Sequence, residues 1–344
     1  MAANAAEIPE TLGIQQTNRH YPIHIALSEQ SVLAGFVDQV ILPTYDSLSQ
    51  DTAFLADVTA ALAANLTAGN LFKAQLAWRR SVLTWQQGTA YTFGPSDSFG
   101  FSGDLDSGLD EVGLINLLES DESLTAATIS DFAASVRGFE AIAYLLFGPE
   151  GAQSADQLTE RELTYLRLLT ADLHTTAENL GTSWSGGVDG YPAYRQIFVS
   201  VGSPDNPAYL SSSAAFEEVI QGLLGTLDEL YKEVLPDLMA APDDMTDTSM
   251  GVSSLSSTYS VLEGTYYAYI GAVPEASGQR DGIADYVAAS NPTVDAAIQQ
   301  QFQIALSALE QARSDPATLT AASIALNTVM IRLEEDVLPL LQEQ

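Results

Sequence analysis

The sequence of 344 residues contains no cysteine. This absence excludes disulfide bonds, thiolate metal sites, CxxC redox motifs and cysteine nucleophiles. Basic residues are scarce as well, with 12 lysines and arginines against 45 aspartates and glutamates, so the formal net charge is −33. A surface of that sign repels phosphate backbones and anionic lipids, which excludes nucleic acid and membrane surfaces as partners. It suits a secreted or envelope protein in a salty medium, where ions screen the self-repulsion.

Long apolar runs are also missing. No stretch reaches 18 consecutive apolar residues, so the sequence predicts no transmembrane segment. The first ten residues, MAANAAEIPE, lack the basic and apolar regions of a signal peptide. Two interpretations follow, a cytosolic protein or a numbering that begins after a removed leader, and we favour the second.

What the sequence does contain is a helical pattern. From Ser31 onward, apolar residues recur at intervals of three and four, and β-branched runs bounded by turns are absent. Asn70, Thr159 and Ser253 each stand directly before an apolar-periodic run and are predicted N-caps. The pattern therefore predicts an all-α protein. The expected helical segments are 31–50, 52–68, 70–92, 124–147, 158–182, 208–240, 252–271, 291–313 and 317–342.

Two segments rich in Gly, Pro, Ser and Asp, 93–108 and 183–207, are predicted loops, and the second separates two helical halves. Two four-helix bundles packed side by side account for the number and length of the helices. A single α-solenoid is the alternative, but no strict repeat of 20–50 residues supports it. The expected organisation is an N-terminal extension (1–29), a first bundle (30–185), a linker (186–207) and a second bundle (208–344).

Three prolines follow an apolar helical run in the same way. Pro43, Pro236 and Pro339 each come after a Val-Leu or Val-Ile-Leu sequence. Proline kinks or ends helices anywhere, so one such proline carries no information. Three copies favour a duplicated bundle unit.

Catalytic motifs are missing. None of the histidines, His20, His24 and His174, has the spacing of a zinc peptidase, and no GxSxG elbow supports a serine hydrolase. The acidic stretch 104–111 resembles a calcium loop, but residues other than the required Gly and Glu occupy the EF-hand positions. We interpret it as a solvated acidic loop, with an irregular oxygen-ligand site as the alternative.

Glu140 is the most informative residue. It is the only charge between Arg137 and Glu150, in a helix that is apolar on nearly every face. An ionised carboxylate in such a place costs several kcal/mol unless it is paired or binds a cation. One interpretation is a structural pair with Arg137, Arg79 or a backbone amide, or a neutral glutamate with a raised pKa. The other is a ligand-facing carboxylate between the bundles.

The segment around Glu140 resembles a known family. Residues 138–148 read GFEAIAYLLFG, which is similar to the run GFHALEYLLFG that carries the GxHxxE motif of the imelysin-like proteins, a group once classed as peptidases. The resemblance to this family covers about residues 30–344. Further matches follow in order along the chain, at 40–45 (VILPTY), 78–85 with 93–95 (FGP), 158–184, 254–264 (SLSSTYSVLEG) and 333–339 (LEEDVLP).

The sequence departs from the family at the motif itself. Glu140 replaces the histidine and Ala143 replaces the glutamate, so only Gly138 is kept. Thr89 stands where a glutamate usually precedes the FGP element, and the histidine and aspartate expected around 251–257 are missing. A site built on imidazole and carboxylate has therefore lost most of its ligands.

The resemblance implies an all-α fold with a site in the cleft between two bundles, in a periplasmic or surface-anchored bacterial protein linked to iron or metal uptake. Because Glu140 and Ala143 replace the motif histidine and glutamate, our leading hypothesis is a non-catalytic binding protein for a metal ion or small ligand, with an envelope protein as a partner. Oxygen ligands favour hard cations such as iron(III), calcium or magnesium. The alternatives are a scaffold protein whose site has decayed and, less favoured, a metallopeptidase. The expected site residues are Glu140, Gly138, Arg79, Glu263, Asp110 and Glu111, with Glu140 and Glu263 as metal ligands.

Overall fold

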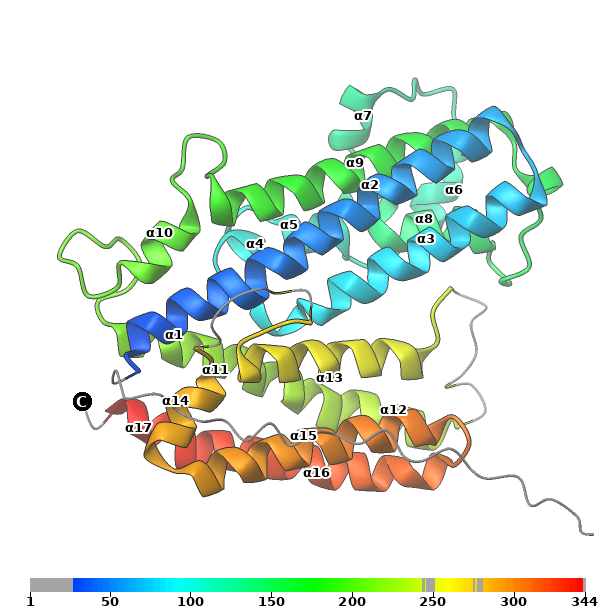
Figure 1. Cartoon of the computed structure of the whole chain (residues 1–344). Helices are drawn as coiled ribbons and strands as arrows, with labels where there is room; N and C mark the ends of the chain where they lie inside the picture. The colour runs from blue at the N-terminus through cyan, green and yellow to red at the C-terminus, as the bar shows by residue number, and fades with distance from the viewer. Residues whose placement is uncertain (1–26, 243–244, 246–250, 275, 277–280, 343–344) are drawn as a thin grey trace, which may run out of the picture.

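The structure is a computed structural model that describes residues 27–242, 245, 251–274, 276 and 281–342. His20 and His24 lie outside these residues. Within the described part every regular element is a helix, which confirms the predicted all-α fold, and the long helices form two groups that lie side by side (Figure 1). No described helix has both the length and the hydropathy needed to cross a bilayer.

The first group is built on four helices around a shared apolar core. The chain runs up α2 and back down α3, and α9 packs along α2, while the shorter α8 closes the group against α3 and α9. These helices are α2 (Leu42–Ala64), α3 (Ala68–Gln87), α8 (Gly138–Phe147) and α9 (Glu160–Ser185).

The second group also contains four main helices. Of these, α13 lies against α3, so it forms the principal contact between the two groups, as Figure 1 shows. The apolar core continues across this contact without interruption. The helices are α11 (Ser212–Glu229), α13 (Ser254–Ile270), α15 (Pro292–Ala312) and α16 (Leu319–Arg332).

Short helices occupy several stretches where the sequence predicted loops or a single long helix. Segment 93–108 contains two of them and segment 183–207 contains another, while the predicted helix 124–147 is broken into α7, a 3₁₀ turn and α8. Runs of four to six residues are too short to show a helical period. The short helices are α1 (Glu29–Phe36), α4 (Pro95–Ser98), α5 (Phe101–Leu105), α6 (Glu111–Glu119), α7 (Ala126–Ser130), α10 (Tyr194–Val199), α12 (Leu235–Ala240), α14 (Ile283–Ser290) and α17 (Leu338–Gln342).

The helix starts follow local side-chain chemistry. Thr159 and Ser253 are N-caps as predicted, each accepting a hydrogen bond from a backbone N–H three residues on. The prediction for Asn70 was wrong. Thr67 is the cap of α3, and its hydroxyl accepts from the Asn70 N–H at 3.2 Å. Threonine and asparagine are both good caps, so the two could not be separated by residue type.

Each of the three prolines noted above follows a wide π-helical turn. The turns are Val37–Ile41, Leu230–Val234 and Leu333–Val337, and in each case the proline is the second residue of the next α-helix. Proline has no N–H and its ring clashes with the carbonyl four residues earlier. A π turn relieves that clash without ending the helix.

Only a glycine allows the two groups to approach as closely as they do. A Cβ atom added to Gly264 of α13 would lie 1.9 Å from the carbonyl oxygen of Gln87, the last residue of α3. Backbone therefore touches backbone where the two groups meet.

Candidate functional site

The start of α8 is held in place by Arg137 and Gly138. The Arg137 side chain is buried and forms ion pairs with Asp104 at 2.5 Å and Asp172 at 3.0 Å. Gly138 has a φ of +70°, and a Cβ atom there would lie 2.6 Å from the Leu105 carbonyl oxygen. Glycine adopts this backbone conformation at no steric cost. These contacts bring the first turn of α8 against the end of α5.

Glu140, in that first turn, meets a second carboxyl group. Its side chain is hydrogen-bonded to Asp106, the residue that follows α5, and Trp85 Nε1 donates to Asp106 Oδ2 at 3.1 Å. We call Asp106 and Glu140 the carboxyl pair. Oε2 of Glu140 is buried and has no hydrogen-bond partner among the described residues.

The carboxyl pair retains a proton at neutral pH. Burial, together with the hydrogen bond and the charge of Asp106, raises the pKa of Glu140 to about 8. A protonated Glu140 can donate to the Asp106 carboxylate, whereas two carboxylates at this distance would repel each other. Of the alternatives open from the sequence, the structure therefore supports a neutral glutamate. The suggested pairing with Arg137 or Arg79 is wrong, because both arginines are held by other groups.

Arg79 belongs to the contact between the two groups of helices. Its Nε donates to the Gly251 carbonyl at 2.6 Å, and its guanidinium lies 5.1 Å from the centre of the Phe147 ring. The neighbouring Trp78 indole donates to the Phe139 carbonyl at 2.9 Å. Arg79 therefore ties α3 to the segment that precedes α13.

Glu263 lies on a different side of α3 from the carboxyl pair. Its carboxylate accepts from Gln87 Nε2 at 3.0 Å and is hydrogen-bonded to Tyr259. Gln87 comes two residues after Trp85, which contacts the carboxyl pair, and two positions on a helix are separated by about 200°. The structure thus gives Glu140 and Glu263 separate partners.

Asp110 and Glu111 have a local role. Asp110 caps α6 by accepting from the Gly113 N–H at 2.9 Å, and both side chains are exposed. The six predicted site residues therefore occupy four places: Gly138 and Glu140 lie together at the start of α8, Asp110 and Glu111 lie together at the start of α6, and Arg79 and Glu263 are each separate. Among the described residues, no three or more His, Asp or Glu side chains gather to hold a metal ion.

Sequence reasoning missed Asp106 and Trp85. Asp106 belongs to the acidic stretch 104–111, but nothing in the spacing distinguishes it from its acidic neighbours. Only the packing of α5 against α8 reveals it as the partner of Glu140.

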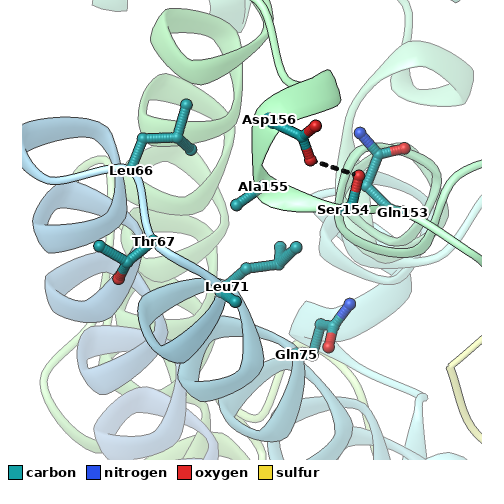
Figure 2. Close-up of a pocket in the computed structure, with 9 residues that line it drawn as sticks. Leu66, Thr67, Leu71, Gln75, Gln153, Ser154, Ala155 and Asp156 are labelled. Carbon is teal, nitrogen blue, oxygen red and sulfur yellow. Dashed lines mark hydrogen bonds between the residues drawn. The ribbon is translucent and has the colours of Figure 1, made fainter.

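Two pockets lie outside the predicted site. The larger, of about 570 Å³, lies between the start of α3 and residues 153–156 (Figure 2). Three of its polar side chains bond to protein atoms: Ser154 donates to Asp156 at 2.7 Å, as Figure 2 shows, and Gln75 donates to the Leu146 carbonyl at 2.8 Å. The smaller pocket, of about 360 Å³, lies between α3, α13 and α15. None of the six predicted residues lines either pocket.

The carboxyl pair predicts a pH-dependent stability. With a folded pKa of about 8 against an ordinary 4.5, the folded state retains a proton that the unfolded state has lost. Stability should therefore fall as pH rises from about 4.5 to about 8. Glu140→Gln keeps a hydrogen-bond donor for Asp106 and cannot ionise, so this part of the pH dependence should vanish.

The measurement is urea unfolding at a series of pH values. Glu150→Gln, at an exposed glutamate three residues after α8, is the control and should keep the wild-type pH dependence. Identical pH profiles for Glu140→Gln and the wild type would contradict the assigned protonation.

Comparison with known proteins identifies the family. The sequence profile described as Imelysin matches residues 41–336. Iron-regulated protein A of Synechococcus elongatus is 32% identical over 336 residues, covering 92% of this chain and 88% of that protein.

Solved structures share the fold. An iron-regulated protein A precursor from Parabacteroides distasonis superposes with a TM-score of 0.75 at 22% identity, covering 89% of this chain and 93% of that one. An imelysin-like protein from Psychrobacter arcticum gives a TM-score of 0.70 at 14% identity, covering 91% and 95%. The profile match and the cyanobacterial relative confirm the resemblance inferred from the motifs: the chain belongs to the imelysin family.

Proposed function

We propose that this chain is a non-catalytic envelope protein of iron physiology, and that its carboxyl pair binds a hard cation by exchanging a proton. The observation that carries the proposal is the buried, unpartnered Oε2 of Glu140 beside Asp106. Buried polar atoms are nearly always hydrogen-bonded, so an orphaned oxygen marks a place where a partner is expected.

The chemistry of the pair fits a hard cation. Iron(III), calcium and magnesium prefer oxygen ligands, whereas the imidazole and thiolate ligands favoured by zinc and copper are missing here. Asp106 is exposed, which gives a cation access from solvent. Because a ligating carboxylate must be deprotonated, the proton held by Glu140 has to leave as the cation enters, so affinity should rise with pH.

The residue types argue against a metallopeptidase. Such enzymes need several protein ligands, an open position and a general base. The family's motif histidine and glutamate are Glu140 and Ala143 in this chain. Two carboxyl groups without imidazole support binding better than hydrolysis.

An envelope location is part of the proposal. One structural relative carries the word precursor in its name, and that relative and the cyanobacterial one are both called iron-regulated. The net charge of −33 is suited to a medium in which salt screens self-repulsion. We infer a periplasmic or surface-anchored protein that presents its cation, or a small ligand, to another envelope protein.

Terbium luminescence provides the test, because this hard trivalent ion is excited by nearby aromatic rings such as Trp85. We expect saturable binding that strengthens between pH 6 and pH 8 and is displaced by iron(III) citrate. Asp106→Asn and Glu140→Gln should each weaken binding by about tenfold or more, which corresponds to ~1.4 kcal/mol. Glu150→Gln should bind as the wild type does and controls for scattered surface carboxylates.

A scaffold protein with a decayed site is the second candidate. The observation in its favour is that only two carboxyl groups come together, with no third ligand among the described residues. Terbium affinity that is equal in the wild type, Asp106→Asn and Glu140→Gln would overturn the cation proposal and favour the scaffold.

A further inference from the structure

The smaller pocket has an apolar floor and a polar rim. It lies where α13 is enclosed by α3 on one side and α15 on the other (Figure 1). Leu255 and Leu309 on its floor are almost completely buried. Its volume of about 360 Å³ lies within the range of small-molecule sites. The lining residues are Leu83, Leu255, Ser256, Tyr259, Ser260, Leu309, Glu310 and Arg313.

Ser260 in this pocket lacks a hydrogen-bond partner. The residue is 7% exposed, and its hydroxyl oxygen keeps some contact with solvent without a hydrogen bond to any described residue. Other hydroxyls of α13 bond back to their own helix: Thr258 donates to the Ser254 carbonyl at 2.7 Å and Thr265 to the Val261 carbonyl at 2.8 Å. An accessible hydroxyl that forms no hydrogen bond to the protein is available to a polar group of a ligand in this pocket.

The rim carries one charge of each sign. Glu310 and Arg313 lie three residues apart at the end of α15, and neither forms an ion pair with the other or with any further described residue. By contrast, Arg195 and Arg332 each hold an aspartate. The Glu310 charge helps to raise the pKa of Tyr259, after burial and the charge of Glu263, which places that carboxylate near the Tyr259 ring on the pocket wall.

We propose that this pocket binds a free α-amino acid with an apolar side chain. Arg313 would hold the carboxylate, Glu310 the ammonium group, and the apolar floor the side chain, while the Ser260 hydroxyl is free to bond to a polar group of the ligand. Glu310 would repel a simple anion, and Arg313 would repel a simple cation. Together, Glu310 and Arg313 therefore select a zwitterion. This activity is separate from cation binding at the carboxyl pair.

Calorimetric titration of the whole chain with L-leucine, in buffer treated with a chelator, tests the proposal. We expect saturable binding in the micromolar to millimolar range. 4-Methylpentanoate, which lacks the amine, and isopentylamine, which lacks the carboxylate, should each bind at least about tenfold more weakly, because each loses a charge-assisted hydrogen bond.

The two arginine variants lie at exposed positions and so avoid a folding defect. Arg313→Gln should weaken leucine binding by about tenfold to a hundredfold. Arg167→Gln is the matched control, at an exposed arginine of α9, and should bind leucine as the wild type does. Ser260→Ala should also weaken binding.

Three results would overturn the proposal: no heat with leucine or phenylalanine at millimolar concentration, equal affinity for leucine and 4-methylpentanoate, or an unchanged affinity in Arg313→Gln. Since the buffer contains no free metal, the outcome does not depend on whether the carboxyl pair binds a cation.

Discussion

Replacing Gly264 by alanine will destabilise the protein by about 3 kcal/mol. The added Cβ would lie 1.9 Å from the Gln87 carbonyl oxygen, and a backbone atom cannot rotate aside as a side chain can. The end of α3 and the middle of α13 must therefore separate, which opens the apolar contact between the two groups of helices. Urea unfolding followed by circular dichroism measures the loss.

Gly225→Ala supplies the matched control. Gly225 also lies inside a helix, α11, but no atom outside its own neighbourhood lies within 4 Å of the position of an added Cβ. Alanine there should stabilise the protein by about 0.5–1 kcal/mol, because glycine loses more conformational freedom on folding. If Gly264→Ala stabilised the protein to the same extent, the close approach of α3 and α13 would be refuted.

Replacing Arg137 by methionine will cost about 3 kcal/mol of unfolding free energy. The change keeps an apolar stem and leaves Asp104 and Asp172 without their shared cation. Removing one partner of a buried ion pair lowers the unfolding free energy by about 3–5 kcal/mol. Both aspartates here retain some contact with water, so we expect a loss near the lower end of that range. Burial already raises the pKa of Asp172, and Arg137 opposes that rise.

An exposed ion pair gives the comparison. Arg332 bonds to Asp336 within one helical segment, and the arginine is 44% exposed, whereas the Arg137 side chain is 9% exposed. Arg332→Met should therefore change stability by less than about 1 kcal/mol. A loss as small as this in Arg137→Met would show that the buried arginine does not anchor the start of α8.

Periodicity in the sequence was sufficient to predict the long helices and the all-α fold, because each of them buries one face over many turns. It failed for α4, α5 and α10, which are too short for a period and are positioned by what surrounds them. Pro43, Pro236 and Pro339 were noticed as a repeated pattern, but the π turns before them depend on hydrogen bonds that a sequence does not display.

The candidate site, too, could be predicted from the sequence only in part. The family motif drew attention to Gly138, and the structure supplies the physical reason, since a side chain there would collide with the Leu105 carbonyl. Glu140 was identified as a charge in apolar surroundings, and a neutral state was among the alternatives. Its partner could not be named, because Asp106 reaches it only through tertiary packing. The predicted ion pair between Glu140 and an arginine followed the general rule that buried charges are paired. The rule fails here because the packing of α5 against α8 places Asp106, and none of the described arginines, beside Glu140.

The π turn before Pro43 is accompanied by a main-chain hydrogen bond that side-chain substitutions do not remove. Pro43 has no N–H to offer the Gln39 carbonyl, and the N–H of Val273, just after α13, donates to that carbonyl instead at 3.1 Å. The bond joins main chain to main chain, so it can persist while both side chains drift during evolution. Native-state hydrogen exchange is the observable that detects it: the Val273 amide should exchange only when the N-terminal helix separates from the second group of helices.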